Sequence, residues 1–111
     1  MNKRFYIFVY CLLFTAYCFC QQTKIDSLQN ILRTTKEDTI QIKTLNALSW
    51  ELKQIGEYDK AMKSATDAFI LSEQINFKKG KVSAYNNIGV IDRLQGNYPE
   101  AIKNYMEALK I

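Results

Sequence analysis

The sequence predicts an all-α fold, a stack of helix-turn-helix hairpins, and three observations predict it. Between residues 39 and 111, apolar side chains recur in steps of three and four residues, the period that brings them to one face of a helix. The chain of 111 residues has only 1 Pro and 4 Gly, as a mostly helical chain requires. A pattern of residue size and polarity also returns after forty residues, which indicates one structural unit used twice.

The start of the chain, residues 1–20, is predicted to be a secretory signal peptide. A short basic head, Asn2-Lys3-Arg4, precedes an apolar run of sixteen residues. Small residues at Cys18 and Cys20 stand just before the polar Gln21-Gln22, which predicts cleavage after Cys20. Because a spanning helix needs roughly 20 residues, an uncleaved membrane anchor is the less favoured alternative.

Removal of this segment changes the composition of the chain. All 3 cysteines lie within it, so the remainder raises no disulfide question. Loss of Lys3 and Arg4 leaves 13 of the 15 basic residues, against all 11 acidic ones. A charge this close to balance predicts no nucleic-acid binding. Contact with a membrane is expected only through an uncleaved signal segment.

Residues 21–38 are predicted to form a lead helix and a polar connector. Apolar residues of the lead helix stand at helical steps, at Ile25, Leu28, Ile31 and Leu32. Asp38 or Thr39 can cap the helix that follows.

Residues 39–80 are predicted to be the first hairpin. Its inner helix runs from Ile40 to Ile55 and ends before Gly56, and its partner runs from about Tyr58 to Gln74. The segment Lys78-Lys79-Gly80-Lys81 is expected to be a solvated loop between hairpins, with a basic binding patch as the alternative.

Residues 81–111 are predicted to be the second hairpin. One apolar stripe stops at Gly96-Asn97, and another follows from Tyr98 to Leu109. Gly96 suits the left-handed conformation that ends a helix, and Pro99 suits the first turn of the next helix. Small residues are expected where the two helices meet, at Gly89, Ala101 and Ala108.

The two hairpins resemble the tetratricopeptide repeat. At the forty-residue offset, Gly56, Tyr58, Ala61 and Ala68 return as Gly96, Tyr98, Ala101 and Ala108. The family's motifs are similar to Tyr85-x-x-Ile88-Gly89 and Ala101-x-x-x-Tyr105. Ala65 and Asp92 depart from the pattern, because the family usually has an aromatic residue there. The spacing also exceeds the usual ~34 residues, and the extra residues around Asn76–Gly80 imply either longer helices or a longer loop.

The resemblance implies a right-handed superhelical stack that binds a protein or an extended peptide. In this family the first helix of each hairpin lines a concave groove, and the matching positions are Asn46, Trp50, Lys53, Asn86, Asn87, Val90 and Arg93. An Asn amide both donates to and accepts from a peptide backbone, but these Asn residues are equally compatible with a solvated helix surface. Trp50 is either an aromatic platform in the groove or packed against the preceding helix. The family's best-known groove clamps a terminal carboxylate with one Lys and two Asn, and only Asn87 matches that set.

No catalytic residue, cofactor or metal site is predicted within the chain. It has no His, and no Cys follows residue 20, which removes the commonest general base, the thiol nucleophile and most zinc sites. The acidic residues are expected on solvated helix faces without a convergent pair, and the 4 Gly are isolated rather than gathered in a phosphate-binding loop. We therefore expect a non-enzymatic protein.

The apolar stripe of the last predicted helix reaches Ile111 without the polar capping helix that solenoids need. Either further repeats follow, or a partner such as a second copy covers this end. We expect an exported scaffold, periplasmic or associated with the inner membrane of a bacterium. The alternative is the extracytoplasmic sensor portion of a histidine kinase or DNA-binding regulator whose output domain lies beyond residue 111, because Lys79–Gly89 resembles such sensors.

Overall fold

The computed structural model describes residues 3–111, apart from the side chains of residues 17 and 18. Residues 1 and 2 of the predicted signal peptide and the side chain of Cys18 therefore lie outside the described part. The described residues form five helices and no strand: α1 (Lys3–Thr34), α2 (Asp38–Gln54), α3 (Tyr58–Ile75), α4 (Lys78–Leu94) and α5 (Tyr98–Leu109). The all-α prediction is confirmed.

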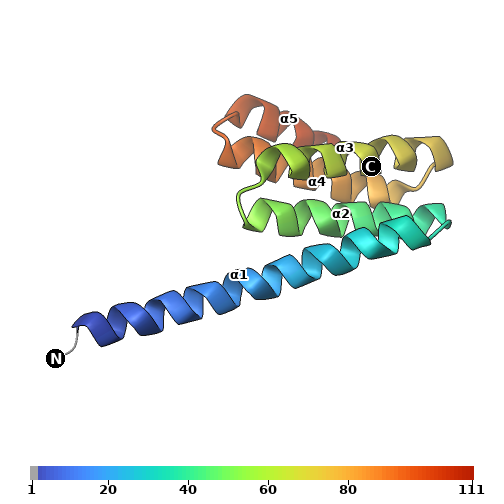
Figure 1. Ribbon diagram of the computed structural model, residues 1–111. Coiled ribbons are helices and arrows are strands. Elements are labelled where there is room, and N and C mark those ends of the chain that lie inside the picture. The colour runs from blue at the N-terminus through green and yellow to red at the C-terminus, as the bar shows by residue number, and fades with distance from the viewer. Residues whose placement is uncertain (1–2) are drawn as a thin grey trace.

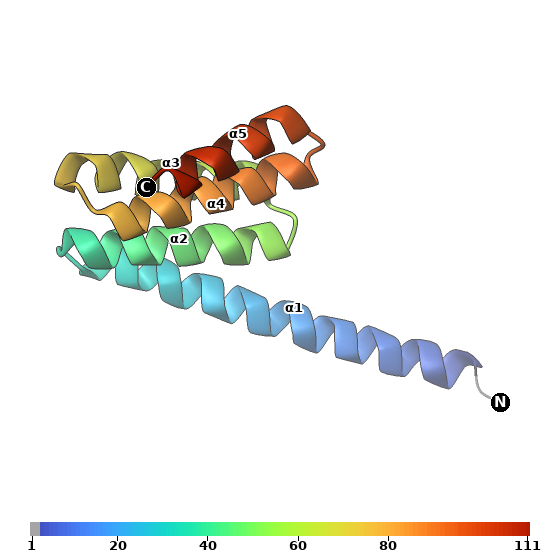
Figure 2. The ribbon, with the colours of Figure 1, turned by 180° about the vertical axis from the view of Figure 1, so that it is seen from behind.

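Four of the helices form two hairpins that stack on each other. Helix α2 packs against α3, α4 packs against α5, and contacts of α4 with α2 and α3 join the two pairs. Helix α1 packs against α2 alone among the helices, and its first half extends away from the stack (Figures 1 and 2). The molecule is therefore a short helical stack with one long helix leading into it.

The structure reproduces the forty-residue repeat. Helix α2 begins at Asp38 and α4 at Lys78, while α3 begins at Tyr58 and α5 at Tyr98, so both offsets are forty residues. The connection between hairpins is only Asn76 and Phe77. The extra length relative to the usual repeat therefore lies in longer helices and not in a longer loop.

The predicted loop at Lys78–Lys81 is wrong, because these residues form the first turn of α4. Asn76 ends α3 in the left-handed conformation at φ 57°, and the N–H of Phe77 donates to the carbonyl of Ser72 at 2.8 Å. This C-cap reverses the chain within two residues. Gly80 is buried, and a Cβ on it would overlap Ile42 and lie 2.6 Å from Ser72 Oγ. Gly80 thus allows α4 to approach α2 and α3 closely.

The turn inside each hairpin is the same. Gly56 and Gly96 have φ of 80° and 84°. The N–H of Glu57 donates to the carbonyl of Leu52 at 3.0 Å, and that of Asn97 donates to the carbonyl of Asp92 at 2.8 Å. A left-handed Gly followed by such a bond is the Schellman termination. In each hairpin, a carbonyl near the end of the first helix therefore accepts a hydrogen bond from the turn that follows.

The core combines small residues of the outer helices, α3 and α5, with larger aliphatic residues of the inner helices, α2 and α4. Ala61, Ala65 and Ala68 of α3 are fully buried, and Ala101 and Ala108 of α5 are buried. A Cβ on Gly89 of α4 would lie 2.7 Å from the ring of Tyr105 in α5. The small side chains bring the helices of each pair together, and Leu48, Leu52 and Ile91 fill the space between them.

The predicted lead helix is continuous with the apolar segment before it, as one helix of 32 residues. Its second half enters the core through Ile25, which is 2% exposed, and Leu28 and Leu32 pack beside it. Most of the described side chains in its first half are exposed. Among the described residues, α1 is the one helix long and apolar enough to cross a membrane, a property that N-terminal signal sequences share.

Candidate protein-binding surface

The positions predicted to bind a partner lie on α2 and α4, which are in contact with each other. In both views these two helices run side by side (Figures 1 and 2). Asn46 is buried and Asn87 is half-buried, and the other five side chains are half-buried or exposed: Trp50, Lys53, Asn86, Val90 and Arg93. We call these five residues the α2–α4 surface. The other two, Asn46 and Asn87, turn toward the contact between the helices.

Asn46 and Asn87 join the two inner helices by hydrogen bonds. The Nδ2 group of Asn46, which is 8% exposed, donates to the carbonyl of Gly80 at 3.2 Å. Asn87 Nδ2 donates to the Oδ1 and the carbonyl of Asn46, at 3.1 and 3.2 Å. Both amides form hydrogen bonds within the protein, so a ligand could bind them only if the hydrogen bonds between the hairpins were broken. The prediction that Asn residues contact a partner rests, in this structure, on Asn86 alone.

Trp50 and Lys53 form the centre of the exposed surface. The Trp50 side chain is 44% exposed, and Lys53 Nζ lies 3.1 Å from the centroid of its ring. A cation at this distance is attracted by the electrons of the ring face. The ring is therefore held beside a positive charge, and much of it remains open to solvent.

Arg93 stands forty residues after Lys53, at the equivalent position of the neighbouring inner helix. Partial burial lowers the pKa of Lys53, and the charge of Arg93 lowers it further, while Glu51 opposes both effects. Two positive groups thus lie at equivalent positions in the last turns of α2 and α4, which are in contact with each other.

Asp92 is a buried carboxylate, which corrects the prediction that all acidic residues are solvated. It is 8% exposed, and its Oδ2 accepts a hydrogen bond from Asn104 Nδ2 at 3.0 Å. Burial raises the pKa of Asp92, and the negative charge of Glu100 raises it further. The hydrogen bond from Asn104 acts in the opposite direction and lowers this pKa. The repeat offset could have revealed its position, because Asp92 is equivalent to Leu52 in the core of the first hairpin.

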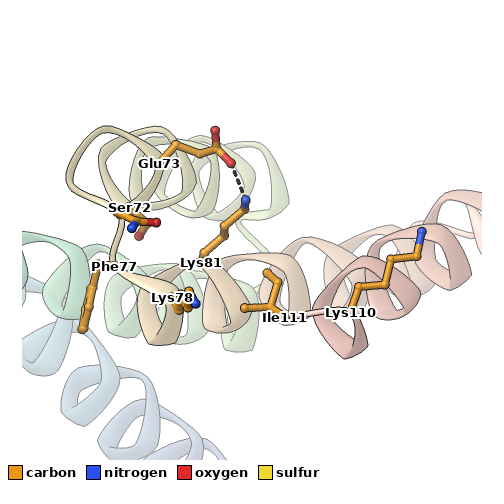
Figure 3. Close-up of a pocket in the computed structure, with 8 residues that line it drawn as sticks. Ser72, Glu73, Phe77, Lys78, Lys81, Lys110 and Ile111 are labelled. Atoms are coloured by element: carbon orange, nitrogen blue, oxygen red, sulfur yellow. Dashed lines mark ion pairs between the residues drawn. The ribbon is translucent and has the colours of Figure 1, made fainter.

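A second surface feature is a cleft of about 440 Å³ between the α3–α4 connection and the end of α5 (Figure 3). Lys78, Lys81 and Lys110 line it. Lys81 forms an ion pair with Glu73 at 2.5 Å, and this bond raises the pKa of Lys81. Lys110 pairs with Glu107 at 3.0 Å. Because two of its three cations have carboxylate partners, this cleft attracts an anion less than its lysine content suggests.

The described residues hold no group of three or more His, Cys, Asp or Glu side chains that could bind a metal ion.

The fold and the α2–α4 surface define the class of the protein as a helical-repeat module. A family model described as tetratricopeptide repeat matches residues 82–111, which are most of α4 and all of α5. Comparison with curated proteins and with solved structures gives no match.

The match supports a tetratricopeptide repeat at the second hairpin. The first hairpin lies outside the matched residues, but it has the same helix order, the same turn and the same offset. Repeats of this family are typically non-catalytic scaffolds that mediate protein–protein interactions. The fold and the family match together suggest that role for this chain.

Proposed function

We propose that the chain is a non-enzymatic scaffold that binds a protein or an extended peptide on the α2–α4 surface. The observation that carries the proposal is the exposure of Trp50, Lys53 and Arg93 on two inner helices that the Asn46–Asn87 bonds hold in register. Trp and Arg are the residue types that contribute most to protein–protein binding. Preformed placement on rigid helices also reduces the entropy that binding costs.

Site-specific photo-crosslinking tests this proposal in the cells that make the protein. A photoreactive residue at Asn86, exposed on the α2–α4 surface, should crosslink one defined protein or peptide. The same residue at Lys60, exposed on α3, is the matched control and should not capture that product. Equal yields of the same product from both positions would contradict the proposal, because contact would then not depend on the surface.

We also propose that the protein is exported, with the first half of α1 as its signal segment. The support is the basic head at Lys3 and Arg4, followed by an exposed apolar helix. Mass spectrometry of protein from the cell envelope should find Gln21 at the N-terminus. Recovery of chains that begin at Met1 in membranes would instead favour a retained anchor, and recovery only from the cytoplasm would contradict export.

The alternative function is the sensor portion of a signalling protein whose kinase or DNA-binding domain follows residue 111. What favours it is the uncovered apolar face of α5, where Ile102 is 58% and Leu109 is 86% exposed. Further repeats would cover such a face. The reading frame after the codon for Ile111 distinguishes the two functions: more repeats and an apolar run of roughly 20 residues favour the sensor.

A further inference from the structure

Lys53 and Arg93 are two cations that form no ion pair within the part of the chain that the structure describes. They occupy equivalent positions in the last turns of α2 and α4. Among the residues that the structure describes, neither forms an ion pair with a carboxylate. Glu51 is near enough to raise the pKa of Lys53, but its effect is smaller than that of Arg93. Two positive charges without an ion-pair partner therefore lie at equivalent positions of the α2–α4 surface.

The placement of these charges is fixed by the fold. The ring of Trp50 holds the Lys53 ammonium at 3.1 Å, and the Asn46–Asn87 bonds fix α2 against α4. One basic residue in the last turn of a helix is favourable on its own, because it faces the negative end of the helix dipole. That effect accounts for each residue separately. It does not account for two basic residues at equivalent positions of helices in contact, where both charges would attract an anion placed between them.

We propose that Lys53 and Arg93 bind the side-chain carboxylate of an Asp or Glu within an extended peptide, beside the ring of Trp50. The inference rests on the proposed scaffold function and names the chemistry of its partner. An internal acidic residue fits better than a chain terminus, because Asn46 and Asn87 use their amide groups in hydrogen bonds within the protein. The exposed part of the Trp50 ring then packs on the apolar stem of that acidic side chain or on its neighbour.

The test uses the full chain in an uncharged detergent and two peptides, both acetylated and amidated so that they carry no terminal charge. One peptide alternates Glu with Ala, and the other replaces each Glu by Gln. Binding is followed by the fluorescence of Trp50. The chain contains 1 Trp, so the Trp emission comes from this residue. The Glu peptide should change the emission and the Gln peptide should not. A third peptide with Glu and a free C-terminal carboxylate should bind as well as the amidated one.

The variants Lys53→Gln and Arg93→Gln should each weaken binding of the Glu peptide by about tenfold, the loss expected for one charged hydrogen bond. Lys103→Gln, which removes an exposed charge from α5, is the matched control and should change the affinity by less than about twofold. Equal losses from Arg93→Gln and Lys103→Gln would overturn the proposal, because net charge alone would then explain binding. So would a preference for the free carboxylate.

Thermal unfolding separates a binding role from a structural one. Arg93→Gln should keep or raise the melting temperature, because it removes repulsion with Lys53. A clear fall would show that Arg93 stabilises the fold, and would count against a binding role. The two proposals can fail separately. If crosslinking at Asn86 finds a partner whose affinity Arg93→Gln and Lys53→Gln leave unchanged, the scaffold function is supported and the carboxylate site is contradicted.

Discussion

At the scale of single residues, the two hairpins differ in charge at one buried position. Leu52 of the first hairpin is 6% exposed in the core, and its equivalent in the second hairpin is Asp92, which is 8% exposed. Asn104 supplies one hydrogen bond to the carboxylate. Burial of a charge with one partner costs free energy unless the group is neutral. Ionised Asp92 therefore costs the second hairpin free energy that Leu52 does not cost the first.

The variant Asp92→Asn should raise the stability at neutral pH by on the order of 1 kcal/mol, because it removes a buried charge and keeps an acceptor for Asn104. A raised pKa in the folded state means that the native protein binds the proton more tightly than the unfolded chain does. Stability should therefore fall as the pH rises from the ordinary Asp value of 3.8 through the raised pKa of Asp92.

Urea unfolding at several pH values measures this effect. The gain from Asp92→Asn should be present at pH 7 and shrink as the pH falls toward 4. The control is Asp67→Asn, which removes a carboxylate in an exposed pair with Lys63 and should change little. A gain that does not depend on pH would show that charge burial is not its cause.

At the scale of helices, the stack depends on how α4 meets α2. Gly80 has no side chain where α4 lies against Ile42 of α2, and its carbonyl accepts a hydrogen bond from Asn46 Nδ2. Asn87 completes the contact from α4. Close approach and polar pairing therefore occur at one place. This fixes the register of the second hairpin on the first.

The variant Asn46→Ala should lower the free energy of unfolding by about 1–3 kcal/mol, because it leaves the Gly80 carbonyl and the Asn87 amide without that partner. Asn86→Ala, on the exposed side of the same contact, should change it by less than about 0.5 kcal/mol. In a double-mutant cycle, Asn46→Ala and Asn87→Ala should not be additive, since they share a bond. Additive losses in chemical denaturation would show that the two amides do not interact.

The same helices show what the sequence could predict. The period of apolar residues and the glycines at 56 and 96 were enough for the hairpins and their turns, because both depend on local chemistry. The Lys78–Lys81 turn was missed because three lysines resemble solvated loop residues, whereas lysines on the outside of a helix also reach solvent. Gly80 is required by Ile42 and Ser72, which are distant in sequence and invisible to a local pattern.

The candidate binding surface was predictable only in part. The repeat offset placed Lys53 and Arg93 at equivalent positions, but their lack of carboxylate partners needed the structure. Asn46 and Asn87 were indistinguishable in sequence from ligand-binding residues. Their bond depends on the crossing of α2 and α4, and a spacing of 41 residues between the partners gives no indication of it.

At the scale of the whole molecule, the stack has one covered end and one open end. The second half of α1 covers α2 through Ile25 and Leu28. On α3, Phe69 packs against Tyr85 of the next helix, with ring centroids 4.9 Å apart. Its equivalent on α5 is Leu109, which is 86% exposed. The α5 face therefore has the chemistry of an inner contact but no described helix against it.

Charge substitution at these two equivalent positions should have opposite consequences. Phe69→Lys should lower the melting temperature, because it removes a half-buried aromatic ring from its contact with Tyr85, at a cost of up to about 3 kcal/mol. Leu109→Lys should leave the melting temperature nearly unchanged and reduce self-association, since it breaks an exposed apolar patch. Thermal melts with light scattering over a range of concentrations test both. A similar fall in melting temperature for the two variants would show that Leu109 is packed in solution.

The most direct test of the central claim, that a protein or peptide binds on the inner helices, is the emission spectrum of Trp50 with and without the partner captured at Asn86. Because 44% of this residue is exposed in the free protein, binding on the α2–α4 surface should shift its emission to shorter wavelength and protect it from a soluble quencher. Light scattering on the same samples reports whether the complex has formed. A complex that forms without any change in emission or quenching would place the partner elsewhere and contradict the claim.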